Sequence, residues 1–170
     1  VKPNSSGSSY GIVKAYKKKD LEDAIHTALK EDDQLIIESE LVGMEISVGA
    51  YAVEGEVKVL PITEIISEND FFDYDAKYNG KSEEITPARL DEVLTNKVNT
   101  IVEKLYEKLK LKGVCRSEFI IVGGIPHLLE VNTIPGLTAA SLIPQQVKAA
   151  GIELTDFFES LLSEAMKKNS

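Results

Sequence analysis

The amino-acid sequence predicts an α+β fold in which helices pack on an antiparallel sheet. Helical and extended patterns alternate along the chain. Two short turns, Glu54-Gly55 and Gly123-Gly124, each join a pair of strand patterns. The 170 residues are 43% hydrophobic, which is enough for a sizeable buried core.

The N-terminal part predicts a strand end, a loop, a strand, a helix and a buried strand. Residues 1–3 have the pattern of a strand end, and a loop rich in serine and glycine separates them from a strand at residues 10–16. A helix is expected from Asp20 to Lys30, capped by Asp20, and a buried strand follows in "QLIIES". Because the chain starts within a strand pattern and without methionine, we expect an N-terminal portion to precede it.

The chain changes character after residue 40. Residues 45–66 are typical of two antiparallel strands that turn at Glu54-Gly55. Residues 67–85 are polar and lack periodicity, and a segment of this length without regular structure is usually functional.

Helical patterns dominate the remainder. Thr86 and Pro87 mark the start of a long helix. The apolar face predicted for this helix consists of Leu94, Val98, Ile101, Leu105 and Leu109. A hairpin around Gly123-Gly124 and two helices, at residues 142–150 and 155–167, complete the chain.

Polar residues interrupt both strands of this hairpin. Side chains alternate along a strand, so Glu130 and Asn132 share one face, and Arg116 and Glu118 share one face of the partner strand. All four lie on the same side if Glu118 is opposite Glu130, which requires a loop with an odd number of residues. We therefore expect a three-residue loop around Gly123-Gly124, with a glycine in the left-handed region. The other face would then carry Phe119, Ile121, Leu129 and Val131.

This polar face predicts a metal site. Carboxylate and amide oxygens suit Mg²⁺ or Mn²⁺, with phosphate oxygens and water completing the coordination. Two adjacent carboxylates also repel each other unless a cation lies between them. Alone, the pattern equally fits an exposed polar face with an incidental Arg–Glu pair, so neighbouring motifs must decide.

Three further stretches have features of nucleotide sites. "KPNSSGSSYG" combines Lys2 with small residues that let backbone N–H groups approach phosphate; the alternative is a simple hairpin turn. In "IIESELVGMEISV", backbone groups at a strand end could bind the edge of a base, and Glu45 could bind ribose hydroxyls. The alternative is an exposed acid at the start of a strand. "FFDYDAKY" places Lys77 among aromatic residues, as a flap over phosphates would, or as an aromatic anchor for a long loop.

Composition narrows the choice of partners. The net charge of −9, from 19 basic and 28 acidic residues, argues against nucleic acid or a membrane surface as partner. A single cysteine, Cys115, cannot form an internal disulfide, which fits a reducing compartment, and it is expected to be a buried small residue. No apolar run approaches the roughly 20 residues of a membrane span.

Taken in order, five motifs resemble those of D-alanine–D-alanine ligases, which are bacterial members of the ATP-grasp superfamily. They are Lys2-Pro3 before "GSSYG", Glu38 with Glu45, "FFDYDAKY", "CRSEF" and "LLEVNTIPGLTAASLIP". The resemblance covers nearly the whole chain. It implies an ATP-grasp fold, with residues 1–40 as the remainder of the central subdomain, residues 41–170 as the C-terminal catalytic domain, and an N-terminal domain absent from this sequence.

The resemblance implies an activity as well. Two D-alanines would be joined through an acyl phosphate, with ATP as co-substrate and two Mg²⁺ or Mn²⁺ ions, for peptidoglycan precursor synthesis in the bacterial cytoplasm. The full-length enzyme would be a homodimer. "AKY" favours the enzyme that forms a peptide over relatives that form an ester with D-lactate. Rival interpretations are another ATP-grasp carboxylate–amine ligase and a nucleotide-binding module without catalysis. A fragment lacking the N-terminal domain is expected to be inactive alone.

Roles follow for individual residues by the same resemblance. The oxyanion would be stabilised by Arg116 and the backbone N–H of Gly136, and the active site would be closed with the help of Ser9 and Tyr78. The ATP-binding residues would be Lys2, Ser8, Glu38, Ser39, Leu41, Glu45, Lys77 and Ile120. The second D-alanine would be bound by Ser141 and Leu142. The metal ligands would be Glu118, Glu130 and Asn132, although these ligases most often have aspartate where this chain has Glu118.

Overall fold

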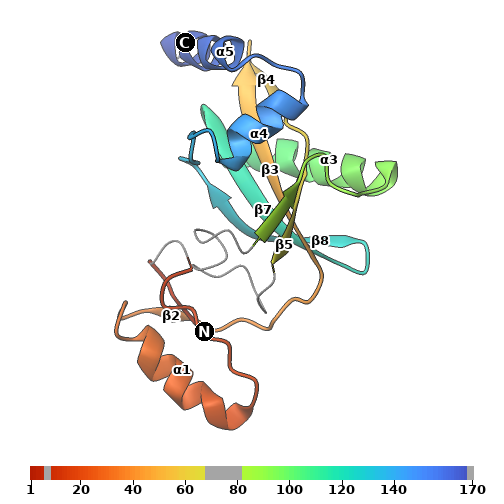
Figure 1. Ribbon diagram of the computed structural model, residues 1–170. Coiled ribbons are helices and arrows are strands. Elements are labelled where there is room, and N and C mark those ends of the chain that lie inside the picture. Colours follow the sequence, from red (N-terminus) through yellow and green to blue (C-terminus); the bar gives the residue numbers. More distant parts are fainter. Residues whose placement is uncertain (6–8, 68–81, 168–170) are drawn as a thin grey trace. The chain divides into compact units, whose positions relative to one another are not determined.

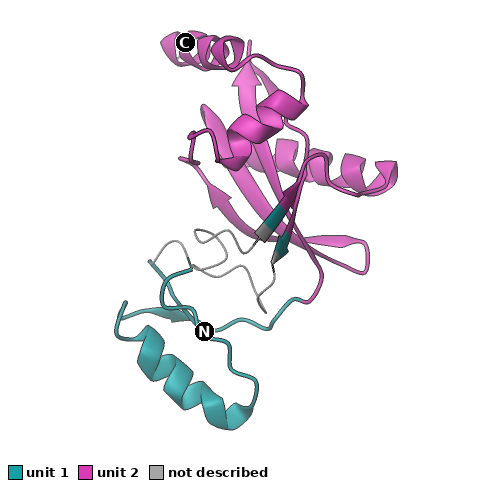
Figure 2. Cartoon of the chain, viewed as in Figure 1, with its two compact units in different colours: residues 1–41, 66–83 teal, residues 42–65, 84–170 magenta. Residues whose placement is uncertain are grey.

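A computed structural model describes residues 1–5, 9–67 and 82–167 (Figure 1). The chain divides into two compact units, one of residues 1–41 and 66–83 and the other of residues 42–65 and 84–170 (Figure 2). The assignment of residues 1–40 and 41–170 to two parts of a larger enzyme stays a prediction.

Among its described residues, the first unit contains helix α1 and a short two-stranded sheet. The elements described in residues 1–41 are β1 (Lys2–Pro3), the 3-10 helix η1 (Lys18–Asp20), α1 (Leu21–Ala28) and β2 (Leu35–Ile36). Strands β1 and β2 pair antiparallel, and α1 buries Ala24 and Ala28. The helix predicted from Asp20 is therefore confirmed.

Several details of this unit differ from expectation. No strand forms at residues 10–16, because Ser9 and Gly11 adopt positive φ values of 58° and 75°, which an extended strand does not contain. Asp20 is the residue before α1, but its carboxylate accepts the N–H of Lys17 (3.1 Å) and so caps η1 instead. The strand expected in "QLIIES" has two half-buried residues, because β1 offers only two residues for pairing.

The second unit is built on a sheet of six strands. They are β3 (Met44–Val53), β4 (Glu56–Val59), β5 (Thr63–Ser67), β6 (Ser82–Ile85), β7 (Val114–Val122) and β8 (Ile125–Asn132). The strand order is β6-β5-β3-β7-β8, and β4 also pairs with β3. Strand β3 is antiparallel to β4, β5 and β7, and β7 is antiparallel to β8.

The predicted turn at Glu54-Gly55 is confirmed, since both residues have positive φ between β3 and β4. Residues 45–66 nevertheless form three strands and not two. The chain leaves β4 at Leu60 and Pro61, and Pro61 has no N–H to continue the ladder. The polar segment expected to lack regular structure ends in strand β6.

Helix α3 (Glu92–Lys108) covers one face of the sheet. Its predicted start at Thr86 is wrong. The Thr86-Pro87 peptide bond is cis, Ala88 N–H donates to the carbonyl of Ile62 (2.8 Å), and the helix begins after Asp91, whose carboxylate accepts the N–H of Leu94 (2.7 Å).

The core on this face joins α3 to strands β3 and β7 and to Ile62, which precedes β5. Val98 is fully buried as predicted, whereas Leu109 ends the helix and is 54% exposed. The buried cluster consists of Ile46, Val48, Ala50, Ile62, Val98, Val102, Tyr106, Cys115, Phe119 and Ile121. Full burial of a side chain the size of Phe119 contributes about 2–3 kcal/mol to stability.

Helices α4 (Leu142–Ala149) and α5 (Leu154–Met166) are both confirmed and pack on the other face (Figure 1). Their core consists of Tyr51, Leu60, Ile143, Val147 and Phe157. Helices therefore cover both faces of an antiparallel sheet, as the predicted α+β class requires. Among the described residues, no helix is long and apolar enough to span a membrane.

Candidate functional site

The candidate site lies on the β7–β8 hairpin, whose turn differs from expectation. Val122 pairs with Ile125, so the loop is two residues long and not three. Gly123 and Gly124 have φ values of 56° and 76°, as a type I′ turn requires at both central positions.

A β-bulge restores the register that a two-residue loop alone would not give. Phe119 pairs with Leu128 and Glu118 with Glu130, which leaves Leu129 without a partner in the ladder. Because a shift of one residue moves every following side chain to the opposite face, the bulge returns the polar residues to a common side. Leu129 is 40% exposed and is not the core residue that the alternation predicted.

Four polar residues consequently lie together, as expected. Arg116 is opposite Asn132, and Glu118 is opposite Glu130. We call these four residues the polar face. Phe119 and Ile121 are buried on the other side, and Val131 packs against the same core.

The polar face combines a partly buried ion pair with an exposed acid. Arg116 Nη2 donates to Glu118 Oε1 (2.6 Å), and the two side chains are 16% and 4% exposed. Glu130 is exposed. One guanidinium therefore faces two carboxylates, and the uncompensated negative charge favours a cation.

The donor set fits a hard divalent cation. The described contacts of Glu118 engage Oε1, and Asn132 Oδ1 accepts the N–H of Ile134 (3.0 Å), which orients the amide. Carboxylate and amide oxygens on one partly exposed face match Mg²⁺ or Mn²⁺. Within the described ranges, no three His, Cys, Asp or Glu side chains form a metal cluster. The protein groups that could bind a cation on the polar face are therefore the two carboxylates and the Asn132 amide.

The neighbouring strand β3 extends this face. Ser47 is opposite Glu118, and Gly49 is opposite Arg116. The predicted ATP-binding residues Glu45 and Ile120 are opposite each other, on the same side as Glu118 because they are two residues away along their strands. The structure thus brings these two residues beside the polar face.

The loop after β8 leads to Ser141, the residue before α4. Ser141 Oγ accepts the N–H of Thr138 (3.2 Å) and shares a hydrogen bond with Thr138 Oγ1 (2.9 Å). A Cβ atom on Gly136 would lie 2.8 Å from Ser141 Oγ, so only glycine allows this approach. Leu142 buries its side chain, which leaves its backbone N–H as the group suited to binding.

The first unit holds four other predicted residues and part of the loop. Lys2 Nζ and Glu38 Oε2 form an ion pair (2.6 Å), Ser39 is exposed and Leu41 is half-buried. Ser9 has a positive φ of 58°. Three predicted residues, Ser8, Lys77 and Tyr78, lie outside the described residues.

Sequence reasoning missed two glutamines of α4. Gln145 Nε2 donates to Glu84 Oε2 (2.8 Å) and to the carbonyl of Ala140 (3.2 Å), close to Ser141. Gln146 is completely buried among strands. The sequence did contain a signal for Gln146, since it is a polar residue on the apolar face of the helix predicted at residues 142–150.

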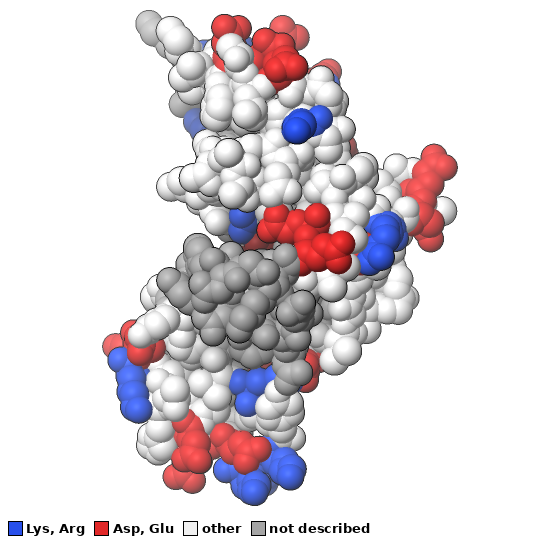
Figure 3. Space-filling view, in the orientation of Figure 1, with Lys and Arg blue, Asp and Glu red and all other residues white. Residues whose placement is uncertain are grey.

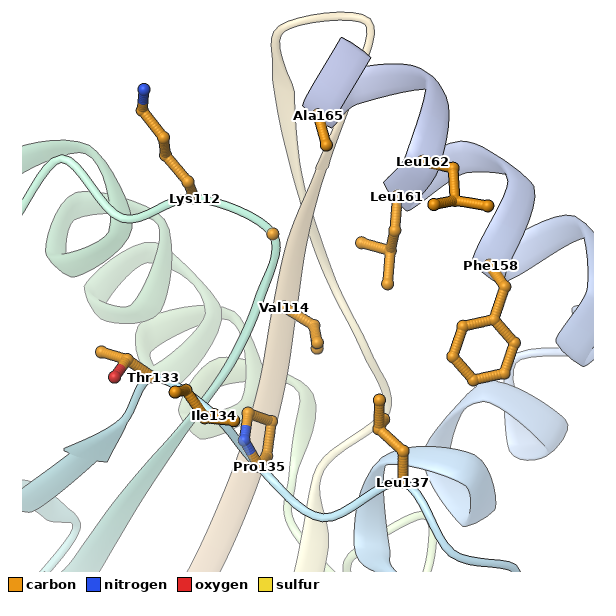
Figure 4. Close-up of a pocket in the computed structure, with 11 residues that line it drawn as sticks. Lys112, Val114, Thr133, Ile134, Pro135, Leu137, Phe158, Leu161, Leu162 and Ala165 are labelled. Atoms are coloured by element: carbon orange, nitrogen blue, oxygen red, sulfur yellow. The ribbon is translucent and has the colours of Figure 1, made fainter.

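A separate groove of about 590 Å³ lies between residues 112–114, the loop after β8 and α5 (Figure 4). Its described lining is mainly apolar, with Ile134, Leu137, Phe158 and Leu162, and its polar side chains are those of Lys112 and Thr133. Since no described acid or histidine lines this groove, it does not supply the metal ligands expected at the polar face.

On the face drawn in Figure 3, described charged side chains gather in several small groups, and wide uncharged areas separate these groups. With a net charge of −9, phosphate binding on this chain must depend on local donors and not on a broad basic surface.

Comparison with known proteins gives consistent matches. The family model described as D-ala D-ala ligase C-terminus matches residues 1–163. D-alanine–D-alanine ligase from Flavobacterium johnsoniae is 60% identical over 162 residues, which cover 95% of this chain and 50% of that protein. The corresponding ligase from Christiangramia forsetii is 51% identical over 168 residues, with 99% and 52% coverage.

Two solved structures share the fold. D-alanine–D-alanine ligase from Bacillus anthracis superposes with a TM-score of 0.78 at 32% identity, covering 98% of this chain and 53% of that one. The VanG D-Ala:D-Ser ligase from Enterococcus faecalis has a TM-score of 0.82 at 30% identity, with 95% and 48% coverage. The chain spans about half the length of the relatives that it matches.

Proposed function

The chain belongs to the D-alanine–D-alanine ligase family and has its ATP-grasp fold, and we propose that it forms the ATP-binding half of a ligase that joins two D-alanines. The products would be D-alanyl-D-alanine, ADP and phosphate, for peptidoglycan precursors in the bacterial cytoplasm. The observation that carries this proposal is the register that unites Arg116, Glu118, Glu130 and Asn132 on one face.

In the first step, the carboxylate of one D-alanine attacks the γ-phosphate of ATP, ADP leaves, and an acyl phosphate forms. Lys2, Ser8 and Lys77 bind the phosphates. Glu45 holds the ribose next to Ile120, and the adenine lies against Glu38, Ser39 and Leu41. The Lys2–Glu38 ion pair (2.6 Å) would open or rearrange when ATP enters, because Glu38 competes with phosphate for the lysine.

Glu118, Glu130 and Asn132 would hold two Mg²⁺ or Mn²⁺ ions. When bound, such ions would neutralise negative charge that develops on the phosphates of ATP. The buried Glu118 is fixed by Arg116, whereas Glu130 is exposed and can adapt to the ligand. Placement on two paired strands gives these ligands a rigid backbone.

In the second step, the amine of the other D-alanine attacks the acyl carbonyl, and phosphate leaves. Arg116 and the N–H of Gly136 stabilise the oxyanion, an effect of roughly 3–4 kcal/mol per donor in comparable sites. Arg116 suits this role because its Nε is buried and has no acceptor among the described residues. Ser141 and the N–H of Leu142, at the start of α4, bind the carboxylate of the second substrate.

Ser9 and Tyr78 close the site, because water would hydrolyse the acyl phosphate.

The domain assignment belongs to this proposal: residues 1–40 complete a central subdomain, residues 41–170 form the catalytic domain, and the remaining half of the enzyme helps to bind the first D-alanine. The full-length enzyme is a homodimer, which its mass in solution would test.

Product analysis tests the reaction. The full-length enzyme is incubated with ATP, Mg²⁺ and D-alanine, L-alanine, or D-alanine with D-serine. We expect phosphate release and a D-alanyl-D-alanine product that depend on D-alanine. A mixed dipeptide as the main product would favour the second candidate, a D-alanine–D-serine ligase, which the match to VanG makes specific. Turnover of L-alanine at an equal rate would contradict both.

A charge-removing variant tests the metal ligands. Glu130→Gln should abolish ligation and leave the fold intact, because the side chain is exposed and makes no hydrogen bond or ion pair within the described ranges. Glu103→Gln, an exposed position on α3, is the matched control and should retain full activity. Near-native turnover of Glu130→Gln would remove the metal assignment.

A further inference from the structure

Gln146 of α4 makes three hydrogen bonds in the interior of the second unit. Its Nε2 donates to the carbonyl of Ser47 (3.0 Å) and to Thr63 Oγ1 (2.9 Å), and its Oε1 accepts the N–H of Gly49 (3.0 Å). The side chain is 0% exposed. A buried amide of this kind is retained only where its partners are supplied, because burial without them costs about 1–3 kcal/mol per polar group.

These bonds fill a break in the sheet. Strand β5 pairs with β3 from Glu45 to Ser47, and β4 pairs with β3 from Ala50 to Val53. Between the two partners, the carbonyl of Ser47 and the N–H of Gly49 would lack a neighbouring strand. The Gln146 amide takes the place of that missing peptide, so the helix is hydrogen-bonded into the sheet and not merely packed on it.

Gly49 makes this contact possible. A Cβ atom at Gly49 would lie 2.6 Å from Gln146 Oε1 and 2.6 Å from Ile143 Cδ1, closer than any ordinary contact. The Gln146 amide therefore fits against Gly49 because Gly49 has no side chain. Together the two residues fix the distance of α4 from β3 and the rotation of the helix about its axis.

The bonded residues of β3 lie directly beside the polar face. Ser47 is opposite Glu118, and Gly49 is opposite Arg116. Ser141 precedes Gln146 by five residues, or about 7 Å along the helix axis. One buried side chain thus connects the backbone next to the metal and oxyanion groups with the helix start that is proposed to hold the second substrate.

We propose that Gln146 is a positioning residue that sets the second D-alanine site against the Arg116–Glu118 pair. The proposal rests on the proposed ligase function and deepens it. Removal of the amide leaves α4 packed but free to slide, so the carboxylate site at Ser141 moves relative to the acyl carbonyl. A displacement of about 1 Å in a reacting geometry can lower the rate by roughly 100-fold.

The test is steady-state kinetics of the full-length enzyme with Gln146→Met, which keeps the length of the side chain and removes its hydrogen bonds. We expect the KM for the second D-alanine to rise by about five-fold or more and the KM for ATP to change by less than about two-fold. Val98→Ala, in the core on the α3 face, is the control for lost stability alone and should leave both KM values unchanged.

A milder variant keeps the test decisive if Gln146→Met does not fold. Thr63→Val removes one acceptor of the Gln146 amide and should shift the same KM in the same direction by a smaller factor. An unchanged KM for the second D-alanine in both Gln146→Met and Thr63→Val would overturn the proposal.

Hydrogen exchange separates this proposal from the ligase function. The Gly49 amide should be protected in the wild type and should exchange faster in Gln146→Met, whatever reaction the enzyme catalyses. A wild type that makes no D-alanyl-D-alanine would refute the proposed function. A Gly49 amide equally protected in both proteins would refute the role of Gln146.

Discussion

Gly49→Ala should destabilise the protein, although alanine is intrinsically better than glycine in a strand by about 0.5–1 kcal/mol. The added methyl group would lie 2.6 Å from both Gln146 Oε1 and Ile143 Cδ1 and 2.8 Å from Leu60 Cδ1. Carbon atoms in contact are normally 3.5–4.0 Å apart, so α4 must withdraw by about 1 Å or the side chains must leave their rotamers.

The magnitude follows from these contacts. Overpacking of a filled core costs about 1–3 kcal/mol, and loss of the bond from Gly49 to Gln146 adds about 1 kcal/mol. After the intrinsic gain of alanine, the free energy of unfolding should fall by about 1–3 kcal/mol. Urea denaturation followed by circular dichroism measures this value.

A double-mutant cycle identifies the cause. Ile143→Val removes Cδ1, one of the clashing atoms, and alone should cost about 0.5–1.5 kcal/mol. The double variant should lose less unfolding free energy than the sum of the two single-variant losses, by at least about 0.5 kcal/mol. Additive losses, or a Gly49→Ala protein more stable than the wild type, would refute the close approach of α4 to β3.

Three further predictions concern single side chains. Burial raises the pKa of the Cys115 thiol to about 11, so it should react with a thiol reagent at pH 8 only after unfolding; rapid labelling of the native protein would contradict its burial. Tyr106→Phe removes the hydrogen bond from the phenol to the carbonyl of Gly113 (2.7 Å) and should cost about 1 kcal/mol in urea denaturation. Hydrogen bonds from Arg89 lower the pKa of the buried Glu64 below 4.5, so the stability from this pair is present above pH 4.5 and is lost as the pH falls further. Arg89→Met should therefore cost about 1–2 kcal/mol near pH 7, because Arg89 is largely exposed, and the difference from wild type should narrow below pH 4.5; a constant difference would exclude this linkage.

Alternation of side chains predicted two same-face pairs in the hairpin, Arg116 with Glu118 and Glu130 with Asn132. Placing all four residues on one side depended on an expected three-residue loop, so the common face is confirmed and its predicted cause is wrong. The structure uses a two-residue turn and a bulge at Leu129. A bulge interrupts the alternation of one strand by a single residue, and the adjacent apolar residues Leu128 and Leu129 do not distinguish it from a regular strand.

Tertiary hydrogen bonds explain the other differences. Thr86 and Pro87 have the composition of a helix start, but Thr86 Oγ1 bonds Thr63 Oγ1 (2.7 Å) and Ala88 bonds Ile62, so α3 begins later. Sequence reasoning missed Gln146 for the same reason, because its hydrogen-bond partners are distant in sequence. The roles proposed for individual residues in binding ATP and D-alanine came from family motifs and could not be deduced from local patterns.

Binding of Mn²⁺ to the full-length enzyme with ADP, measured by electron paramagnetic resonance, tests most directly whether the polar face holds divalent cations. Wild type and the control Glu103→Gln should each bind two ions, and Glu130→Gln should lose at least one of them while its unfolding curve stays unchanged. Equal Mn²⁺ binding in wild type and Glu130→Gln would contradict the assignment of this face as the metal site.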